Sequence, residues 1–237
     1  MKLIDRLQYI ADEINQGETV ADIGTDHGFL PLYLLKTGKS PHVIMADISS
    51  GSLNKAAENC RLFNINEDYE LRLGNGLEVL EKNETDTVVI AGMGGQLIRD
   101  ILASDIDKTN SIKRFIIQPR NKSGVLRLWM KKNGLKSVKE GLVREGKFIC
   151  EILTVETGFR PCENAEWSPE YDYPELLLDN DFEITGDYLE YKLKFEELIY
   201  SGITEGKDVP EEKKMMSRNK IEHLKHLIRE MKDHENK

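Results

Sequence analysis

Short apolar runs alternate along the chain with longer segments in which apolar residues recur at every third or fourth position. The runs are typical of buried strands, and the periodic segments are typical of amphipathic helices. The predicted strands cover residues 20–23, 42–47, 69–74, 85–92 and 113–119. The predicted helices cover residues 2–15, 29–35, 49–64, 93–104 and 125–132. Because strands separated by helices form βαβ units, we expect a parallel α/β sheet that is covered on both faces.

The alternation ends after residue 132. Residues 135–156 contain two β-rich runs around a polar turn at 144–147, which predicts a hairpin that closes the sheet with an antiparallel strand. From about Pro161 the chain is acidic and punctuated by prolines, so we expect a linker that packs locally.

Two amphipathic segments, 188–203 and 211–232, follow this linker. Two helices joined by a short loop predict an αα-hairpin. The chain is therefore expected to divide into an α/β domain, residues 1–160, and a helical, coiled-coil-like domain, residues 161–237.

Composition adds an exposed helical region to this picture, because 32% of the 237 residues are charged and only 39% are apolar. The net charge of −9 argues against a surface that binds nucleic acid everywhere, but it allows a local basic face. The three cysteines have unrelated spacings, which predicts neither a disulfide framework nor a zinc site and favours a reduced, cytoplasmic compartment. The chain starts without signal-peptide features and lacks an apolar run of the ~20 residues that cross a bilayer, so a soluble protein is expected.

The stretch Thr19–Pro31 reads as a strand, a tight turn and the start of a helix. Its turn is rich in acids and glycines, and such a turn presents backbone N–H groups and the positive end of a helix to a ligand. The candidate ligand-binding residues here are Asp22, Gly24, Asp26, His27 and Gly28.

This turn departs from the dinucleotide fingerprint GxGxxG, because Asp26 stands where the second glycine is required. A pyrophosphate would meet the Asp26 carboxylate instead of a bare backbone. The sequence therefore disfavours NAD and FAD, and favours a cofactor with a cationic centre and an amino-acid end.

Two other strand ends add candidates for a nucleoside. Asp47 ends the second strand 23 residues after Gly24, close to the ~20-residue offset at which an acid binds a ribose. Asn75 and Gly76 follow the third strand, where they would reach an adenine ring or form a plain turn. Arg6 is interpreted as a surface charge, with the alternative that it faces the cofactor cleft.

A glycine loop, Gly92-Met93-Gly94-Gly95, follows the fourth strand. Glycine is entropically costly, and ligands of open α/β sheets bind at this edge, so the loop is expected to let a flat substrate approach the backbone. Gln118 and Arg120, after the fifth strand, supply an amide and a guanidinium at the same edge.

Together these residues resemble the class I methyltransferases that use S-adenosylmethionine. The segments DIGTDHGFLP, AGMGG and the QP pair more closely resemble the bacterial tRNA adenine-22 N1-methyltransferase family. The resemblance spans the whole chain and implies a Rossmann-like methyltransferase domain, a C-terminal helical domain, and methylation of N1 of an adenine in the D-loop region of tRNA.

The resemblance also implies roles for single residues. Asp47 is the ribose-binding acid with Ile48 beside it, and Asn75 and Gly76 form the adenine-side loop. Asp26 is the candidate carboxylate that steadies the developing positive charge or contacts N6, and His27 orients the methionine end of the cofactor; the alternative for both is helix capping. The implied catalytic set is Asp26, Gly92, Met93 and Gly94, and the implied cofactor set is Asp22, Gly24, Asp26, His27, Gly28, Asp47, Ile48, Asn75, Gly76 and Gly92.

The glycine loop departs from the Asn-Pro-Pro-Tyr type sequence that other amino-directed methyltransferases carry at this position. This departure suits an adenine N1, whose lone pair attacks without losing a proton, so that positioning matters more than a base.

The tRNA substrate needs an auxiliary surface, since N1 lies on the Watson–Crick edge of a base that must be unpaired or flipped out. The basic last helix is the candidate surface, and its alternative is a solvated coiled-coil face. The expected substrate contacts are Gln118, Arg120, Lys213, Lys220 and Arg229, without an obligate protein partner. The rival functions are an NAD-dependent oxidoreductase and a non-catalytic RNA-binding protein on a vestigial methyltransferase fold.

Overall fold

The computed structural model describes residues 1–65, 68–206 and 209–235. The strands are β1 (Val20–Ile23), β2 (Val43–Asp47), β3 (Tyr69–Leu73), β4 (Thr87–Met93), β5 (Arg114–Pro119), β6 (Lys136–Glu145) and β7 (Phe148–Glu156). The helices are α1 (Asp5–Glu13), α2 (Phe29–Lys36), α3 (Ser50–Leu62), η1 (Gly76–Val79), α4 (Gly95–Ala103), α5 (Ile106–Ser111), α6 (Ser123–Lys132), α7 (Pro169–Asp172), η2 (Glu175–Asp179), α8 (Phe182–Glu205) and α9 (Glu211–Glu235).

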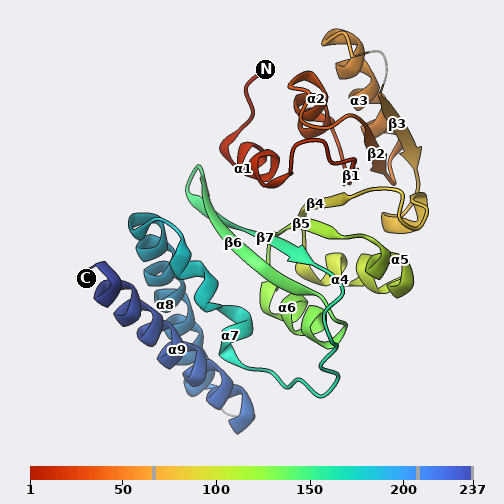
Figure 1. Ribbon diagram of the computed structural model, residues 1–237. Helices are drawn as coiled ribbons and strands as arrows, with labels where there is room; N and C mark the ends of the chain where they lie inside the picture. Colours follow the sequence, from red (N-terminus) through yellow and green to blue (C-terminus); the bar gives the residue numbers. More distant parts are fainter. Residues whose placement is uncertain (66–67, 207–208, 236–237) are drawn as a thin grey trace.

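The seven strands form one sheet in the order β3-β2-β1-β4-β5-β7-β6 (Figure 1). The first five strands are parallel, and β7 is antiparallel to both of its neighbours, β5 and β6. The predicted Rossmann-like methyltransferase sheet with its closing hairpin is therefore confirmed. Among the described residues, no helix is long and apolar enough to cross a membrane.

Helices cover both faces of the sheet because successive strand residues point to opposite sides. In β4, Val88 and Ile90 pack with side chains of α4 and α6, whereas Val89 packs with α1 and α2 on the other face. Helix α3 covers the same face of the sheet as α1 and α2, through a smaller cluster around Met45 and Cys60. Apolar residues on both sides of the strands explain why the strands read as continuous apolar runs in the sequence.

The segment after the sheet is more ordered than the predicted linker. It contains α7 and η2, and α8 begins at Phe182, not at the predicted residue 188. The Asp181 carboxylate caps α8 by accepting hydrogen bonds from the backbone N–H groups of Glu183 and Ile184. The sequence does not show this start clearly, because Phe182 and Ile184 alternate with polar residues and Gly186, a poor helix former, follows them.

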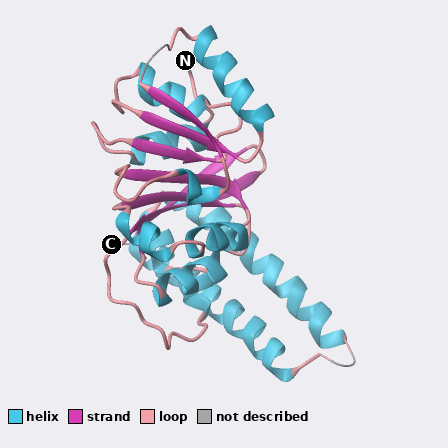
Figure 2. Ribbon diagram, turned by 90° about the vertical axis from the view of Figure 1, so that its right-hand side faces the viewer, coloured by secondary structure: helices cyan, strands magenta, loops and turns pink. Residues whose placement is uncertain are grey.

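Helices α8 and α9 lie side by side as an αα-hairpin that projects from the sheet (Figure 2). Residues 207–208 of the loop between them lie outside the described part of the chain. The hairpin buries Tyr188, Leu224 and Leu227 in a cluster that also contains Leu142 of β6. The division at residue 160 stays a prediction, because the two predicted domains share this cluster.

Candidate active site

The carboxyl ends of the central strands bring the predicted turns together. The backbone N–H groups of Gly24 and Thr25 both donate to the carbonyl of Ala46, which joins the first turn to the end of β2. The Arg120 N–H donates to the carbonyl of Met93 over 2.8 Å, which joins the turn after β5 to the glycine loop. The candidate residues after β1, β2, β4 and β5 therefore share one edge of the sheet.

Gly24 lies at the centre of this edge and faces the glycine loop. Its φ of +81° lies in the left-handed region, which favours glycine, and a Cβ at this position would contact the Met93 Cε. The first turn and the end of β4 therefore approach each other closely at Gly24.

Asp22 is a buried carboxylate just before this turn, with an exposed fraction of 8%. Burial raises the pKa of Asp22 to about 6, Asp47 adds to the rise, and Thr25 and Arg6 oppose it. The Thr25 hydroxyl is buried beside the Asp22 carboxylate, where it lowers the Asp22 pKa, but among the described residues it makes no hydrogen bond of regular geometry. The Asp22 carboxylate and the Thr25 hydroxyl are suited to a polar or cationic ligand, because buried polar groups need hydrogen-bond partners.

Arg6 reaches this edge from α1. Its Nε lies 3.0 Å from the Glu145 Oε2 at the tip of the β6–β7 hairpin, and its charge lowers the pKa of Asp22. The alternative in which Arg6 faces the cleft therefore fits the structure better than a purely external charge.

Asp26 and His27 lie on the exposed side of the first turn. The Asp26 Oδ2 is 3.5 Å from the His27 Nε2, and the Asp26 Oδ1 is 3.8 Å from the Lys55 Nζ. The His27 ring stacks on Phe29 with 5.5 Å between centroids. Helix α2 begins after Gly28 without a side-chain cap, so capping of this helix does not account for either residue.

The end of β2 carries an acid and an exposed apolar side chain. The Asp47 Oδ1 accepts from the Ser49 N–H over 2.8 Å, and its Oδ2 lies 3.4 Å from the Asp26 N–H. Ile48 is 74% exposed, and Leu73, which pairs with Asp47 in the sheet register, is 62% exposed. Exposed aliphatic side chains beside an acid suit a nucleoside, whose base is apolar on its faces and whose ribose donates hydrogen bonds. The sequence analysis missed Leu73, because it reads as an ordinary strand residue.

The turn after β3 lies next to this acid. The Gly74 N–H donates to the Asp47 carbonyl over 3.1 Å, and Asn75 is exposed at the start of η1. Gly76 is buried, and a Cβ there would come within 2.9 Å of Ile101. The plain-turn interpretation thus explains Gly76, whereas the Asn75 side chain is available to a ligand.

Gln118 and Arg120 differ in accessibility. Gln118 is buried and contacts the glycine loop, because its Oε1 accepts from the Gly92 N–H over 3.0 Å. Arg120 is exposed at the edge of the sheet. The glycine loop is shorter than predicted, because Gly92 and Met93 belong to the end of β4 and Gly95 is the first residue of α4. Gly94 lies between them, and a Cβ there would lie 3.2 Å from the Asn121 Oδ1.

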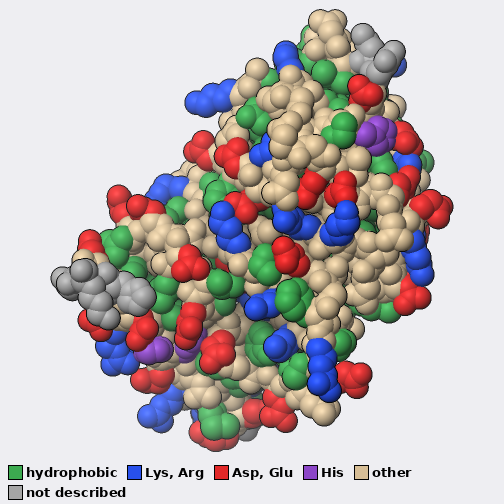
Figure 3. Space-filling model, viewed as in Figure 1, with side chains coloured by type: hydrophobic (Ala, Val, Ile, Leu, Met, Phe, Trp, Pro, Cys, Tyr) green, Lys and Arg blue, Asp and Glu red, His purple; other side chains and the backbone are tan. Residues whose placement is uncertain are grey.

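The three predicted contacts on α9 have different surroundings. Lys213 and Arg229 are exposed, and their separation of 16 positions corresponds to about 24 Å along the helix. The Lys220 Nζ instead lies 3.3 Å from an Asp172 oxygen and 3.6 Å from a Glu196 oxygen. Lysines and arginines are scattered among acids on the face shown in Figure 3, so no uniform basic surface covers it.

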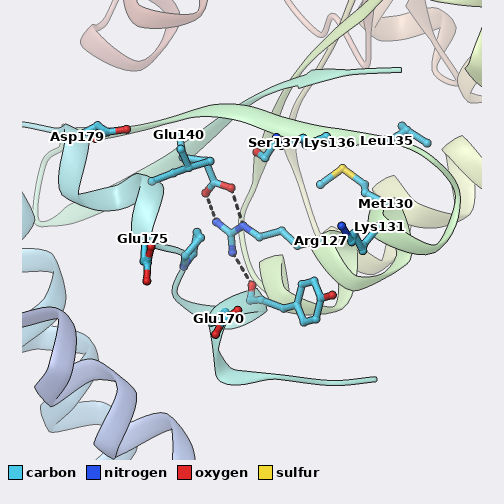
Figure 4. A pocket seen from close by; sticks show the side chains of 13 residues that line it. Arg127, Met130, Lys131, Leu135, Lys136, Ser137, Glu140, Glu170, Glu175 and Asp179 are labelled. Atoms are coloured by element: carbon cyan, nitrogen blue, oxygen red, sulfur yellow. Dashed lines mark hydrogen bonds and ion pairs between the residues drawn. The ribbon is translucent and has the colours of Figure 1, made fainter. Parts of the chain in front are cut away.

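A separate hollow of about 670 Å³ lies away from this edge, between α6, the start of β6 and the segment 170–179 (Figure 4). It is lined by Arg127 and Glu140, which pair with each other, and by Ser137 near the amino end of β6. Because it lies toward the opposite edge of the sheet, it is not continuous with the candidate active site.

The residues at the carboxyl edge fit S-adenosylmethionine. A buried carboxylate, Asp22, suits a ligand with cationic groups, and the neighbouring Thr25 hydroxyl supplies a further polar contact. Asp47 and Ile48 suit the nucleoside half of the same ligand. Among the described residues, no group of three or more His, Cys, Asp or Glu side chains is arranged to hold a metal ion.

Comparison with known proteins agrees with this chemistry. A family model described as a methyltransferase domain matches residues 3–153. The curated tRNA (adenine(22)-N(1))-methyltransferase of Bacillus subtilis (strain 168) is 36% identical over 160 residues, which cover 68% of this chain and 67% of that protein.

Two solved structures extend the similarity to nearly the full chain. The B. subtilis m1A22 tRNA methyltransferase TrmK has a TM-score of 0.77 at 30% identity and covers 98% of each chain. M. capricolum TrmK, in complex with S-adenosyl-homocysteine, has a TM-score of 0.76 at 26% identity, over 96% of this chain and 98% of that one. These relatives support neither the oxidoreductase nor the non-catalytic alternative. The chain belongs to the tRNA (adenine(22)-N(1))-methyltransferase family.

Proposed function

We propose that this protein transfers a methyl group from S-adenosylmethionine to N1 of adenine 22 of tRNA, giving 1-methyladenosine. The observation that carries the proposal is the carboxyl edge, where the buried Asp22 and the acid Asp47 lie on either side of a tight glycine turn and next to an open glycine loop. Family membership supplies the nucleic acid substrate and the position of the target base.

The first turn and the ends of β2 and β3 hold the cofactor. Asp22 and Thr25 face its cationic amino-acid half, Asp47 accepts hydrogen bonds from its ribose, and Ile48 and Leu73 contact its base. When bound, S-adenosylmethionine supplies an electrophilic methyl group on a sulfonium. Gly24 and Met93 approach each other closely between the cofactor side and the substrate side.

The glycine loop and Asp26 serve the adenine. The N1 lone pair of neutral adenine attacks directly, so the protein must hold the two reactants in line at near-attack distance. The product carries a positive charge, and the exposed Asp26 carboxylate at the same edge stabilises that charge or contacts N6. General-base catalysis is not required for this step.

The tRNA is held outside the methyl-transfer site. Arg120 at the sheet edge and Lys213 and Arg229 on α9 are exposed and contact phosphates. The target base is unpaired or flipped out, because N1 of a paired adenine is inaccessible. The enzyme acts in the cytoplasm.

Mass spectrometry of nucleosides tests the proposed function. Unmodified tRNA is incubated with the enzyme and methyl-labelled S-adenosylmethionine, digested, and mapped by position. Labelled 1-methyladenosine at position 22 is the expected result. A methylated base of another type, or label at another position, would refute the proposal.

Asp47→Ala is expected to weaken binding of S-adenosylmethionine by about 10- to 100-fold, because a charge-assisted hydrogen bond is worth about 1.5–3 kcal/mol. Isothermal titration calorimetry measures the effect directly. The matched control is Asp107→Ala on α5, which removes an exposed acid that lies far from the edge and pairs only with Lys82 at 3.4 Å. Equal affinity in the Asp47 variant and the control would remove Asp47 from the cofactor site.

Charge reversal on α9 is expected to separate tRNA contacts from structural contacts. Lys213→Glu and Arg229→Glu together weaken tRNA binding, increasingly so at low salt, and leave the melting temperature unchanged, because both side chains are exposed. Lys220→Glu instead lowers the melting temperature, since it places a third acid beside Asp172 and Glu196. Electrophoretic mobility shifts and thermal melts of all variants provide the measurements. Normal tRNA binding by the double variant at low salt would show that α9 has another role.

A further inference from the structure

We propose that Gln118 is a positioning residue for methyl transfer, which withholds the Gly92 N–H from the substrate by accepting its hydrogen bond. This inference rests on the proposed function, since it concerns how the glycine loop receives the adenine. It also changes the role predicted for Gln118, from a substrate contact to a side chain that shapes the loop.

A bulge in the sheet creates the need for such a residue. The β4–β5 register shifts between Ala91, which pairs with Gln118, and Met93, which pairs with Pro119, so Gly92 has no opposite residue. Gly92 adopts a φ of +76°, which turns it out of the regular ladder. A bulged residue leaves its backbone groups without the usual strand partner.

The Gln118 side chain takes over the role of that missing partner. Its Oε1 accepts from the Gly92 N–H over 3.0 Å, and its Nε2 donates to the Pro119 carbonyl over 3.1 Å. This side chain is 3% exposed, and each of its two polar atoms makes a hydrogen bond inside the protein. Its contacts stabilise the bulge from inside the protein.

The rest of the loop is fixed against the turn that follows β5. The Gly95 N–H donates to the Asn121 carbonyl over 2.9 Å, and a Cβ on Gly95 would meet the Asn121 and Lys122 carbonyls at 2.7 Å. A Cβ on Gly92, in contrast, would find no atom within 4 Å. Gly92 is thus the point at which the loop backbone lies open at the site edge.

The chemistry of adenine N1 explains why the Gly92 N–H should already be hydrogen-bonded within the protein. Adenine N1 reacts through its in-plane lone pair, and a backbone N–H directed to N1 would bind that lone pair and stabilise the unreactive substrate. Because Gln118 accepts the Gly92 N–H, the loop presents its backbone carbonyl oxygens to the substrate. These oxygens can accept hydrogen bonds from the adenine N6 amino group. Loss of the Gln118 amide would free the Gly92 N–H to compete for the N1 lone pair. It would also make the bulge less rigid.

The test compares two substitutions of similar size. Gln118→Met removes the acceptor and keeps the volume, whereas Gln118→Glu keeps an oxygen that accepts the Gly92 N–H. We expect kcat for tRNA methylation to fall about 100-fold in the Met variant, with affinity for S-adenosylmethionine within about threefold of wild type. The Glu variant should retain a higher kcat than the Met variant although its buried acid lowers the melting temperature more. Gln16→Met, on an exposed loop that precedes β1, serves as the control.

A packing role predicts the reverse order, because an apolar isostere is then tolerated better than a buried acid. If kcat follows the melting temperatures, or if Gln118→Met keeps wild-type kcat, the proposal is wrong. Should the Met variant fail to fold, Gln118→Asn, whose amide is one methylene too short, replaces it with the same expectations.

Amide hydrogen exchange of Gly92, followed by NMR in the absence of substrate, provides a readout independent of activity. Protection of this N–H should persist in Gln118→Glu and be lost in Gln118→Met. Unchanged protection in the Met variant would overturn the proposal. If wild-type enzyme fails to methylate tRNA, the proposed function fails by itself, and the exchange measurement still decides whether Gln118 holds the bulge.

Discussion

Replacing Arg127 by methionine is expected to lower the free energy of unfolding by about 3–5 kcal/mol, because it leaves buried carboxylates without their counter-charge. Arg127 lies on α6 and is 6% exposed. Its Nε donates to the Glu140 Oε1 over 2.9 Å, and its Nη2 donates to the Glu151 Oε2 over 2.6 Å. Figure 4 shows the guanidinium facing the Glu140 carboxylate. Its Nη1 donates to the Tyr171 carbonyl over 3.0 Å. The substitution therefore removes one link between the sheet and the segment that leads to the helical hairpin, whereas the hydrogen bonds between Asn180 and β6 remain.

The loss should depend on pH in a defined direction. Burial alone would raise the pKa of Glu151, but Arg127 and Lys192 hold it below its ordinary value. A lowered carboxyl pKa contributes stability above the ordinary pKa of about 4.5, and that contribution disappears as the pH falls through the folded-state pKa. Without Arg127 the Glu151 pKa rises, so the gap between variant and wild type should be wide at pH 7 and narrower near pH 4. Urea unfolding at several pH values measures this gap.

Two controls distinguish burial from loss of a charge. Lys113→Met removes an 80% exposed side chain from its pair with Asp86 and should leave stability nearly unchanged. The triple variant Arg127→Met, Glu140→Gln, Glu151→Gln removes the charges together and should recover much of the loss. A loss below about 1 kcal/mol in the single variant would contradict the assigned role.

Arg127 also illustrates what the sequence does not show. The helical periodicity of residues 125–132 predicts the helix but gives no sign that its arginine is buried. Its burial depends on two acids from β6 and β7 and on the carbonyl of Tyr171, all distant in sequence. Local patterns predict elements because they reflect local burial, whereas a buried ion pair depends on the assembled fold.

The strands β1, β2 and β4 were predictable because they are largely buried on both faces and so read as apolar runs. The strand β3 is largely exposed and was predicted from its alternation of residue types. Helix α5 was not predicted, because its six residues, Ile106–Ser111, are mostly polar and too few to show a helical period. Its N-cap, Asp105, accepts a hydrogen bond from the Lys108 N–H, which is a local signal that the sequence analysis did not use.

The site was predictable where glycines and acids follow strands, and less so where a role depends on a neighbour. The Gly24 turn and the glycine loop were found from their sequence, and the structure brings them together. Thr25 was not predicted, because the burial of its hydroxyl beside the Asp22 carboxylate depends on the assembled fold. Gln118 was found as a candidate, but its contacts with Gly92 and Pro119 required the three-dimensional structure.

Asp22→Asn is expected to stabilise the cofactor-free protein by up to about 3 kcal/mol at pH 7.5, and to weaken its binding of S-adenosylmethionine. Burial, the main cause, raises the Asp22 pKa to about 6 from its ordinary value of 3.8. A raised carboxyl pKa means that folding favours the protonated form. The resulting penalty is absent below about pH 4, develops as the pH rises through about 6, and is complete above that value. Chemical denaturation of wild type and variant between pH 4 and 8 measures the difference.

Cofactor affinity should show the opposite dependence on pH. A cationic ligand favours ionised Asp22, so wild-type affinity for S-adenosylmethionine should rise about tenfold from pH 5 to pH 7, as the ionised fraction of a group with a pKa of about 6 does. The Asn variant should lack this rise, and subtraction of its profile removes the contributions of Asp26, His27 and Asp47, which lie at the same edge.

S-Adenosylhomocysteine identifies the group that Asp22 faces, because it keeps the ammonium but lacks the sulfonium charge. A tenfold rise with both ligands would place Asp22 beside the ammonium, and a rise confined to S-adenosylmethionine would place it beside the sulfonium. Parallel profiles for wild type and Asp22→Asn would contradict a role for Asp22 in binding either cation. The same carboxylate would then be a cost to folding without a ligand that offsets it, and stabilisation by the Asn variant would persist when the cofactor is bound.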